Sequence, residues 1–210
     1  VNGGKVVDAI LIDRIQDSEG ETIFNNDGRK CINCDQISYL GNDYPNIKDS
    51  YKKVFSPQTA YQMTSILEGV VQRGTGKKLR DLKLNIAGKT GTTNKNTDTW
   101  FVGFTSNLLV GVYVGSDNPM PLGRYETGSK TALPIFKNFI QKVVKKSDAR
   151  PFKAVKGTVM MVIDPDTGQK AKFSSKNTII EVYKEKNIID GKVIFLNNNR
   201  LDTNNILKFY

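Results

Sequence analysis

One stretch decides the fold of this chain, Ile86-Ala87-Gly88-Lys89-Thr90-Gly91-Thr92-Thr93. A polar turn follows at residues 94–96, and then a mostly apolar run over residues 100–114 that is interrupted at Ser106 and Asn107. Short apolar segments separated by polar turns predict strands. We therefore expect three short antiparallel strands, with Lys89 to Thr92 on the first, in an α+β fold whose antiparallel sheet packs against helices.

The residue types on the first strand suit the binding of a peptide. The Lys89 ammonium can hold a carboxylate or help to move a proton. Gly91 has no side chain, so a second chain can approach the strand and pair with it by strand addition. Thr90 and Thr92 share a face, and the Thr92 hydroxyl can donate a hydrogen bond to a terminal carboxylate. Lys89, Thr90, Gly91 and Thr92 are thus candidate substrate-binding residues, with Lys89 also a catalytic candidate.

Two simpler interpretations compete for the same residues. Gly-Lys-Thr could close a phosphate-binding P-loop, but that motif needs a glycine five residues before Gly88, where Lys83 stands. The segment could also be an ordinary strand beside a turn, and its residue pattern alone leaves that alternative open.

Composition excludes several chemistries. The 210 residues include no histidine, which removes Ser-His-Asp and Cys-His catalysis and nearly all zinc chemistry. A serine hydrolase would need lysine as its base, and we expect neither a metal nor a cofactor. The formal net charge is +10, yet the lysines are spread out and no nucleic-acid motif occurs, so we expect no nucleic-acid partner. No apolar run approaches the ~20 residues of a membrane helix.

The only two cysteines are Cys31 and Cys34. One C-x-x-C pair cannot complete a four-cysteine zinc site, and no thioredoxin-like β-α pattern surrounds it. Three interpretations stay open: a small-loop disulfide, two free thiols, or half of a metal site shared with a partner.

The other segments predict a simple order of elements. Residues 6–15 and 22–24 predict a hairpin, residues 30–53 a long loop, and residues 187–210 a polar tail. A helix should start at Ser56 and Pro57 and end at Gly74, packing on the sheet and holding the Lys89 strand, with a buried stripe of Ala60, Met63, Ile66, Leu67, Val70 and Val71.

Three further elements follow the central strands. Residues 131–145 predict a second helix with a buried stripe of Ala132, Ile135, Phe136, Phe139, Ile140 and Val143. Residues 159–164 and 178–183 predict two more strands.

Longer segments in this order resemble the penicillin-binding proteins, most closely the bifunctional class A, type 1A. The resemblance covers residues 1–186 and rests on Asn2-Gly3-Gly4, Leu11-Ile12-Asp13-Arg14-Ile15, Pro57-Gln58-Thr59-Ala60-Tyr61-Gln62-Met63, Val71-Gln72-Arg73-Gly74-Thr75-Gly76, Lys89-Thr90-Gly91-Thr92 and Asp98-Thr99-Trp100-Phe101-Val102-Gly103-Phe104-Thr105. Thr127-Gly128-Ser129 resembles the segment that leads into the family's last helix.

The resemblance implies a function. Residues 1–186 would be the C-terminal part of a transpeptidase domain that resembles the penicillin-binding and β-lactamase fold. Its parent would cross-link peptidoglycan as a D,D-transpeptidase, with Lys89, Thr90, Gly91 and Thr92 binding the D-Ala-D-Ala stem peptide or a β-lactam. The parent would lie on the periplasmic face of the inner membrane, anchored by a segment outside this sequence, and that location would favour a disulfide between Cys31 and Cys34.

The family's other two motifs, S-x-x-K with its nucleophile and S-x-N, lie upstream of K-T-G. We expect the chain to be a piece of a longer protein that is inactive alone. Ser50, Ser116 and Ser175 stand in similar triplets or quartets, but each has the wrong context or order. Alternatives are a D,D-carboxypeptidase or β-lactamase relative, or a non-catalytic binding module of this fold. Without the upstream strands, an open sheet edge near residues 110–114 would favour self-association.

Overall fold

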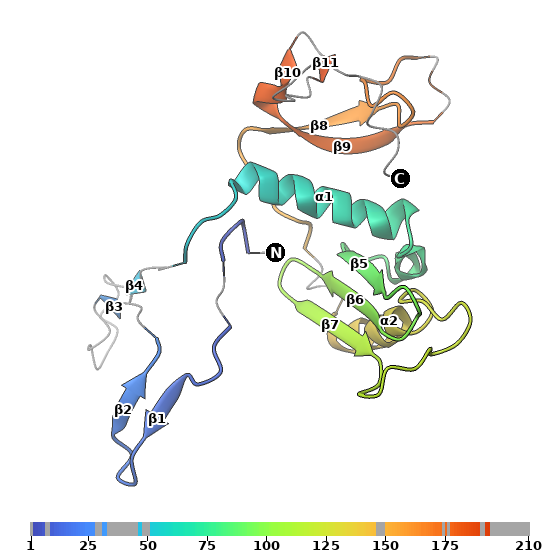
Figure 1. The fold of residues 1–210 in the computed structure, drawn as a ribbon. Coiled ribbons are helices and arrows are strands. Elements are labelled where there is room, and N and C mark those ends of the chain that lie inside the picture. Colours follow the sequence, from blue (N-terminus) through green and yellow to red (C-terminus); the bar gives the residue numbers. More distant parts are fainter. Residues whose placement is uncertain are drawn as a thin grey trace. The chain divides into compact units, whose positions relative to one another are not determined.

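The computed structural model describes residues 2–6, 9–27, 31–32, 46–47, 51–145, 150–173, 175, 177–189 and 192–193. The chain divides into two compact units, Asn2–Phe55 and Ser56–Tyr210, and each is described by itself (Figure 1). None of the helices in these ranges combines the length and the apolar character needed to cross a membrane.

The first unit contains two short antiparallel pairs. Strand β1 (Arg14–Gln16) pairs with β2 (Thr22–Asn25), so that Ile15 lies opposite Phe24. The Asp17 carboxylate accepts hydrogen bonds from the backbone N–H groups of Glu19 (3.0 Å) and Glu21 (2.9 Å) and thereby closes the turn. The predicted hairpin is confirmed, but its first strand begins at Arg14 rather than Val6. Every residue of β1 and β2 is exposed, so no buried face specifies the register of this pair and the turn sets it.

A second pair lies within the loop predicted over residues 30–53. Strand β3 (Cys31–Ile32) pairs with β4 (Asn46–Ile47). Cys34 lies outside the described residues, and so does any bond that it forms.

Helix α1 (Pro57–Arg73) begins and ends where its sequence predicts. The Ser56 hydroxyl accepts a hydrogen bond from the Thr59 N–H at 3.2 Å, which satisfies a donor of the first turn. Pro57 occupies the first helical position, where its missing N–H costs nothing. The Gly74 N–H donates to the Val70 carbonyl at 3.0 Å and ends the helix.

The buried face of α1 differs from the predicted stripe. Met63 and Ile66 are 50% and 40% exposed, and the buried residues are Tyr61, Thr64, Gly69 and Val71. The reason is that α1 packs against both β5 (Ala87–Thr92) and β9 (Ile179–Lys184), so its buried surface does not follow a single stripe. Thr64 tolerates burial because its hydroxyl donates to the Ala60 carbonyl at 3.0 Å.

The central sheet has the strand order β5-β6-β7 and is antiparallel throughout. Its strands are β5 (Ala87–Thr92), β6 (Thr99–Phe104) and β7 (Leu109–Val114). This arrangement confirms the three strands predicted from the sequence. Thr93 and Asp98 close the first turn, and Thr105 and Leu108 close the second, through backbone hydrogen bonds of 3.0 and 2.8 Å.

Helix α2 (Ala132–Val143) contacts β6 and β7 and closes the hydrophobic core (Figure 1). Phe101 and Phe136 meet edge to face with their ring centroids 4.7 Å apart. The fully buried members of this core are Val71, Leu79, Ile86, Phe101, Ala132, Leu133, Phe136 and Ile140.

The prediction of buried residues on α2 was wrong for half of them. Ile135, Phe139 and Val143 are exposed, whereas Leu133, which was not predicted, is fully buried. The apolar surface of α2 is broader than the single side that β6 and β7 cover. Sequence periodicity identifies such a surface but not how much of it meets a partner.

Strands β8 (Thr158–Ile163) and β9 (Ile179–Lys184) form an antiparallel hairpin that agrees with the two predicted strands within about a residue. Polar contacts join it to α1. The Gln62 side chain donates to the Val182 carbonyl at 3.1 Å, the Lys184 ammonium donates to the Thr59 hydroxyl at 2.6 Å, and Arg73 pairs with Glu181.

Short elements complete the second unit. A 3₁₀ helix, η1 (Lys77–Leu82), follows α1, and another, η3 (Glu185–Asn187), follows β9. Strands β10 (Ile188–Ile189) and β11 (Lys192–Val193) then pair within the segment predicted to be a tail, so this segment begins with structure that the sequence did not predict.

Candidate functional site

The four candidate residues lie together on β5, an outer strand of the central sheet. Among the described residues, β5 pairs with β6 alone, so its other edge carries no strand. The side chains of Lys89 and Thr92 are exposed, and Thr90 and Gly91 are half-buried. The predicted position of this segment, on a strand with access to solvent, is therefore confirmed.

Lys89 already has neutral partners. Its ammonium donates to the Thr90 backbone carbonyl at 2.9 Å and approaches the Thr90 hydroxyl at 3.4 Å. The Thr90 hydroxyl in turn lies 3.0 Å from the hydroxyl of Thr75, just beyond the end of α1. No carboxylate in the described part of the chain pairs with Lys89, so its charge can meet an anionic ligand.

Thr92 is oriented by a residue to which the sequence assigned no role in the site. The backbone N–H of Gly128 donates to the Thr92 hydroxyl oxygen at 3.1 Å. Because this oxygen accepts one bond, its own proton points elsewhere and can be donated to a ligand oxygen. The only sequence signal was the Thr127-Gly128-Ser129 triplet before α2.

Gly128 approaches the strands so closely that no larger residue fits. A β-carbon at this position would clash with the Trp100 carbonyl oxygen and would lie 2.6 Å from the Gly91 carbonyl oxygen. At Gly91 itself, an added β-carbon would meet only Trp100, at 3.2 Å. The Gly128 segment is thus packed against the backbone of the sheet, whereas a side chain at Gly91 would meet only the side chain of Trp100.

An aromatic pair lies in the same row of the sheet as Gly91. The register places Gly91 opposite Trp100, and Trp100 opposite Tyr113. The two ring centroids are 4.9 Å apart, and the residues are 45% and 48% exposed. Nearly half of Trp100 therefore faces solvent beside Gly91.

The pair is fixed by a carboxylate. The Tyr113 hydroxyl donates to one Asp98 carboxylate oxygen at 2.7 Å, and the Thr97 hydroxyl donates to the other at 2.8 Å. These two hydrogen bonds, the Tyr113 bond first, lower the pKa of Asp98. The same Asp98 bond, with a smaller contribution from burial, raises the pKa of Tyr113.

The remaining candidate residues do not join this site. Ser116 is exposed after the end of β7. Ser175 donates to the Asp164 carboxylate at 3.1 Å and so belongs to the connection between β8 and β9. Ser50 and Cys34 lie outside the described residues, and Cys31 belongs to the separate first unit.

Comparisons with known proteins agree with this arrangement. The family model "Penicillin binding protein transpeptidase domain" matches residues 1–141. Penicillin-binding protein 1A of Rickettsia prowazekii is 40% identical over 189 residues, which are 89% of this chain and 24% of that protein. Penicillin-binding protein 1A of Pseudomonas aeruginosa is 38% identical over 136 residues, which are 64% of this chain and 16% of that protein.

A solved structure is also similar. The crystal structure of penicillin-binding protein 1A from Haemophilus influenzae matches with a TM-score of 0.63 at 27% identity, over 86% of this chain and 30% of that one. The chain spans a quarter or less of the length of these two curated relatives.

Replacing Gly128 with alanine should destabilise the second unit. The new β-carbon would meet backbone oxygens of β5 and β6, which cannot rotate away, so we expect a loss of about 1–3 kcal/mol in the free energy of unfolding. Urea unfolding followed by tryptophan fluorescence measures it. Gly111→Ala is the matched control, because its β-carbon would meet only Val102 at 4.0 Å. Equal stability of the two variants would contradict the close approach.

Tyr113→Phe should remove a pH-dependent contribution to stability. A lowered Asp98 pKa stabilises the fold at neutral pH, and this stabilisation is lost as the pH falls through the folded-state pKa. A raised Tyr113 pKa stabilises the fold below about pH 10 and is lost above it. The difference in Tm between wild type and variant should therefore be largest near neutral pH and shrink at both extremes. Tyr125→Phe, which alters an exposed tyrosine elsewhere, should show no such profile.

Proposed function

Since this chain belongs to the family of penicillin-binding protein transpeptidase domains, we propose that its parent protein cross-links peptidoglycan stem peptides through a serine acyl-enzyme. In this proposal the chain supplies the strand along which the D-Ala-D-Ala end of the donor peptide lies. The observation that carries it is the Lys89-Thr90-Gly91-Thr92 segment on a strand that is open to solvent and whose second edge is unpaired among the described residues.

The edge of β5 and three of its residues, Lys89, Gly91 and Thr92, have proposed roles. The peptide backbone pairs with the edge of β5, and Gly91 leaves room for it. The Thr92 hydroxyl, held by the Gly128 N–H, donates its proton to the terminal carboxylate of the peptide or of a β-lactam. The Lys89 ammonium attracts the same carboxylate and supports the proton transfers around the nucleophile.

The reaction needs groups that this chain does not supply. A serine hydroxyl from the rest of the transpeptidase domain attacks the carbonyl of the penultimate D-Ala, and the terminal D-Ala leaves as the acyl-enzyme forms. An amine of a second stem peptide then takes the acyl group and releases the serine. We infer that the parent is a bifunctional class A protein on the periplasmic face of the inner membrane, with a glycosyltransferase domain, because the relatives are penicillin-binding proteins 1A.

The second unit also shows apolar surface that a larger domain would cover. On one face of the sheet, Trp100, Val102, Leu109 and Tyr113 are exposed. In the described part of the chain β7 pairs only with β6, so it too has an unpaired edge. We infer that the rest of the transpeptidase domain covers this face and pairs with β7. In its absence the chain covers the face with a second copy of itself.

The chain alone should not react with a fluorescent penicillin, whereas the full-length parent should be labelled on a serine. In the parent, Thr92→Val should slow acylation roughly 10- to 100-fold, because it removes a hydrogen bond to a charged carboxylate. Gel fluorescence with rate measurements reports both results. Thr178→Val, at an exposed threonine outside the site, is the control. A covalent label on this chain alone would refute the division of roles.

In light scattering the isolated chain should form dimers or larger species as its concentration rises. Leu109→Glu places a charge on the exposed face of the edge strand β7 and should shift the chain toward monomer. Ile23→Glu makes the same change at an exposed residue of β2, in the other unit, and should leave the association unchanged. A wild-type chain that is monomeric at every concentration contradicts the inference.

A further inference from the structure

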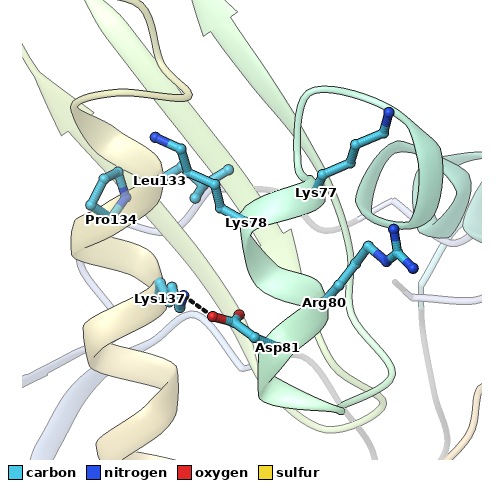
Figure 2. Close-up of a pocket in the computed structure, with 7 residues that line it drawn as sticks. All are labelled: Lys77, Lys78, Arg80, Asp81, Leu133, Pro134 and Lys137. Carbon is cyan, nitrogen blue, oxygen red and sulfur yellow. Dashed lines mark hydrogen bonds and ion pairs between the residues drawn. The ribbon is translucent and has the colours of Figure 1, made fainter.

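A basic cleft of about 630 Å³ lies between η1 and the first half of α2 (Figure 2). Four cationic side chains and one carboxylate line it, above an apolar base. The lining residues are Lys77, Lys78, Arg80, Asp81, Leu133, Pro134 and Lys137.

The single carboxylate in the lining is already paired. The Lys137 ammonium donates to the Asp81 carboxylate at 2.5 Å, as Figure 2 shows, and this hydrogen bond is the main reason that the pKa of Asp81 is lowered. Asp81 and Lys137 thus neutralise each other and hold η1 against α2. The formal charge that remains in the cleft comes from Lys77, Lys78 and Arg80.

These three cations have no anionic partner within the described part of the chain. Lys78 has only a long hydrogen bond, 3.4 Å, to the Ser129 backbone carbonyl. Like charges so close in sequence repel one another, and an anion between them relieves the repulsion. An arginine fork can bind one carboxylate through two parallel hydrogen bonds, with the lysines adding charge.

The base of the cleft adds a second requirement. Leu133 is fully buried beneath it, and Pro134 has no backbone N–H to offer a ligand. Figure 2 shows the Lys78 side chain reaching across toward these two residues of α2. A ligand that fits therefore combines acidic groups with an aliphatic portion that contacts the half-buried Pro134, as a peptide with acidic side chains does.

The cleft is coupled to the strand of the candidate site through a short segment. The Ser129 carbonyl accepts the bond from Lys78, and the preceding residue, Gly128, donates to the Thr92 hydroxyl. The Gly128 carbonyl also accepts a hydrogen bond at 2.8 Å from the N–H of Leu133, a residue that lines the cleft. The segment from Gly128 to Leu133 therefore connects the two surfaces through these hydrogen bonds.

We propose that this cleft binds the free carboxylates of an acidic peptide, namely a stem peptide of peptidoglycan. In this proposal another stem peptide of the same peptidoglycan lies along β5, where it is cross-linked. The inference rests on the proposed function for the identity of the peptide. Its preference for carboxylates rests on Lys77, Lys78 and Arg80 alone. The cleft would hold the glycan-linked peptide near the acyl-transfer site without taking part in the chemistry.

The test measures binding of fluorescent disaccharide-peptide fragments of peptidoglycan to the whole chain by anisotropy. The double variant Lys77→Glu with Arg80→Glu should weaken binding about tenfold or more, because two charge-assisted contacts become repulsive. The matched control, Lys142→Glu with Lys145→Glu, changes the net charge equally at exposed lysines outside the lining and should bind within about twofold of wild type. A fragment with amidated carboxylates should bind wild type about as weakly as the native fragment binds the double variant.

Other outcomes overturn the proposal. Equal losses in both double variants would show that the overall charge of the chain, rather than the cleft, binds the fragment. Phosphatidylglycerol vesicles or inorganic phosphate that bind through Lys77 and Arg80, unaffected by the peptide fragment, would assign the cleft to phosphate. A second double variant, Lys77→Gln with Arg80→Gln, removes the two charges without reversing them. If its thermal melt matches that of wild type, a loss of binding in this variant is not caused by unfolding.

The outcome is separable from that of the proposed function. If the parent is acylated by penicillin but the cleft variants bind like wild type, only the cleft assignment fails. If the parent is not acylated while the double variant still loses carboxylate binding, the transpeptidase proposal fails and the acidic-peptide site remains.

Discussion

The close approach of Gly128 to strands β5 and β6 is the constraint on which the second unit depends. The absence of a β-carbon lets the backbone of this segment meet the carbonyls of Gly91 and Trp100. The Gly128 N–H then holds Thr92, and its carbonyl accepts the N–H of Leu133 in the first turn of α2. One residue therefore aligns the candidate strand and places the helix that closes the core over Phe101.

The sequence predicted those features that short-range chemistry determines. The Ser56 cap, the Pro57 start and the Gly74 end defined α1, and alternating apolar residues with polar turns defined the three central strands. The four residues on β5 were found because their types are unusual together. The family resemblance is confirmed by the matching family model and relatives.

The features that the sequence did not predict depend on residues that are distant in the chain but adjacent in the fold. The predictions of which residues of α1 and α2 are buried were partly wrong, because an apolar stripe does not reveal how many elements pack against it. The role of Gly128, 36 residues beyond Thr92, needs the tertiary fold. The basic cleft arises where η1 meets α2, and no single segment carries its signal.

The resting position of Lys89 has a consequence for any peptide that arrives. The ammonium already donates to the Thr90 carbonyl, a backbone acceptor on the strand along which we propose that the peptide lies. When such a peptide docks, the Lys89 ammonium loses its hydrogen bond to a neutral carbonyl and forms one to a charged carboxylate. Only the difference in free energy between these two hydrogen bonds favours the bound state. A ligand without a carboxylate therefore gains little by replacing the Thr90 carbonyl as the partner of the Lys89 ammonium.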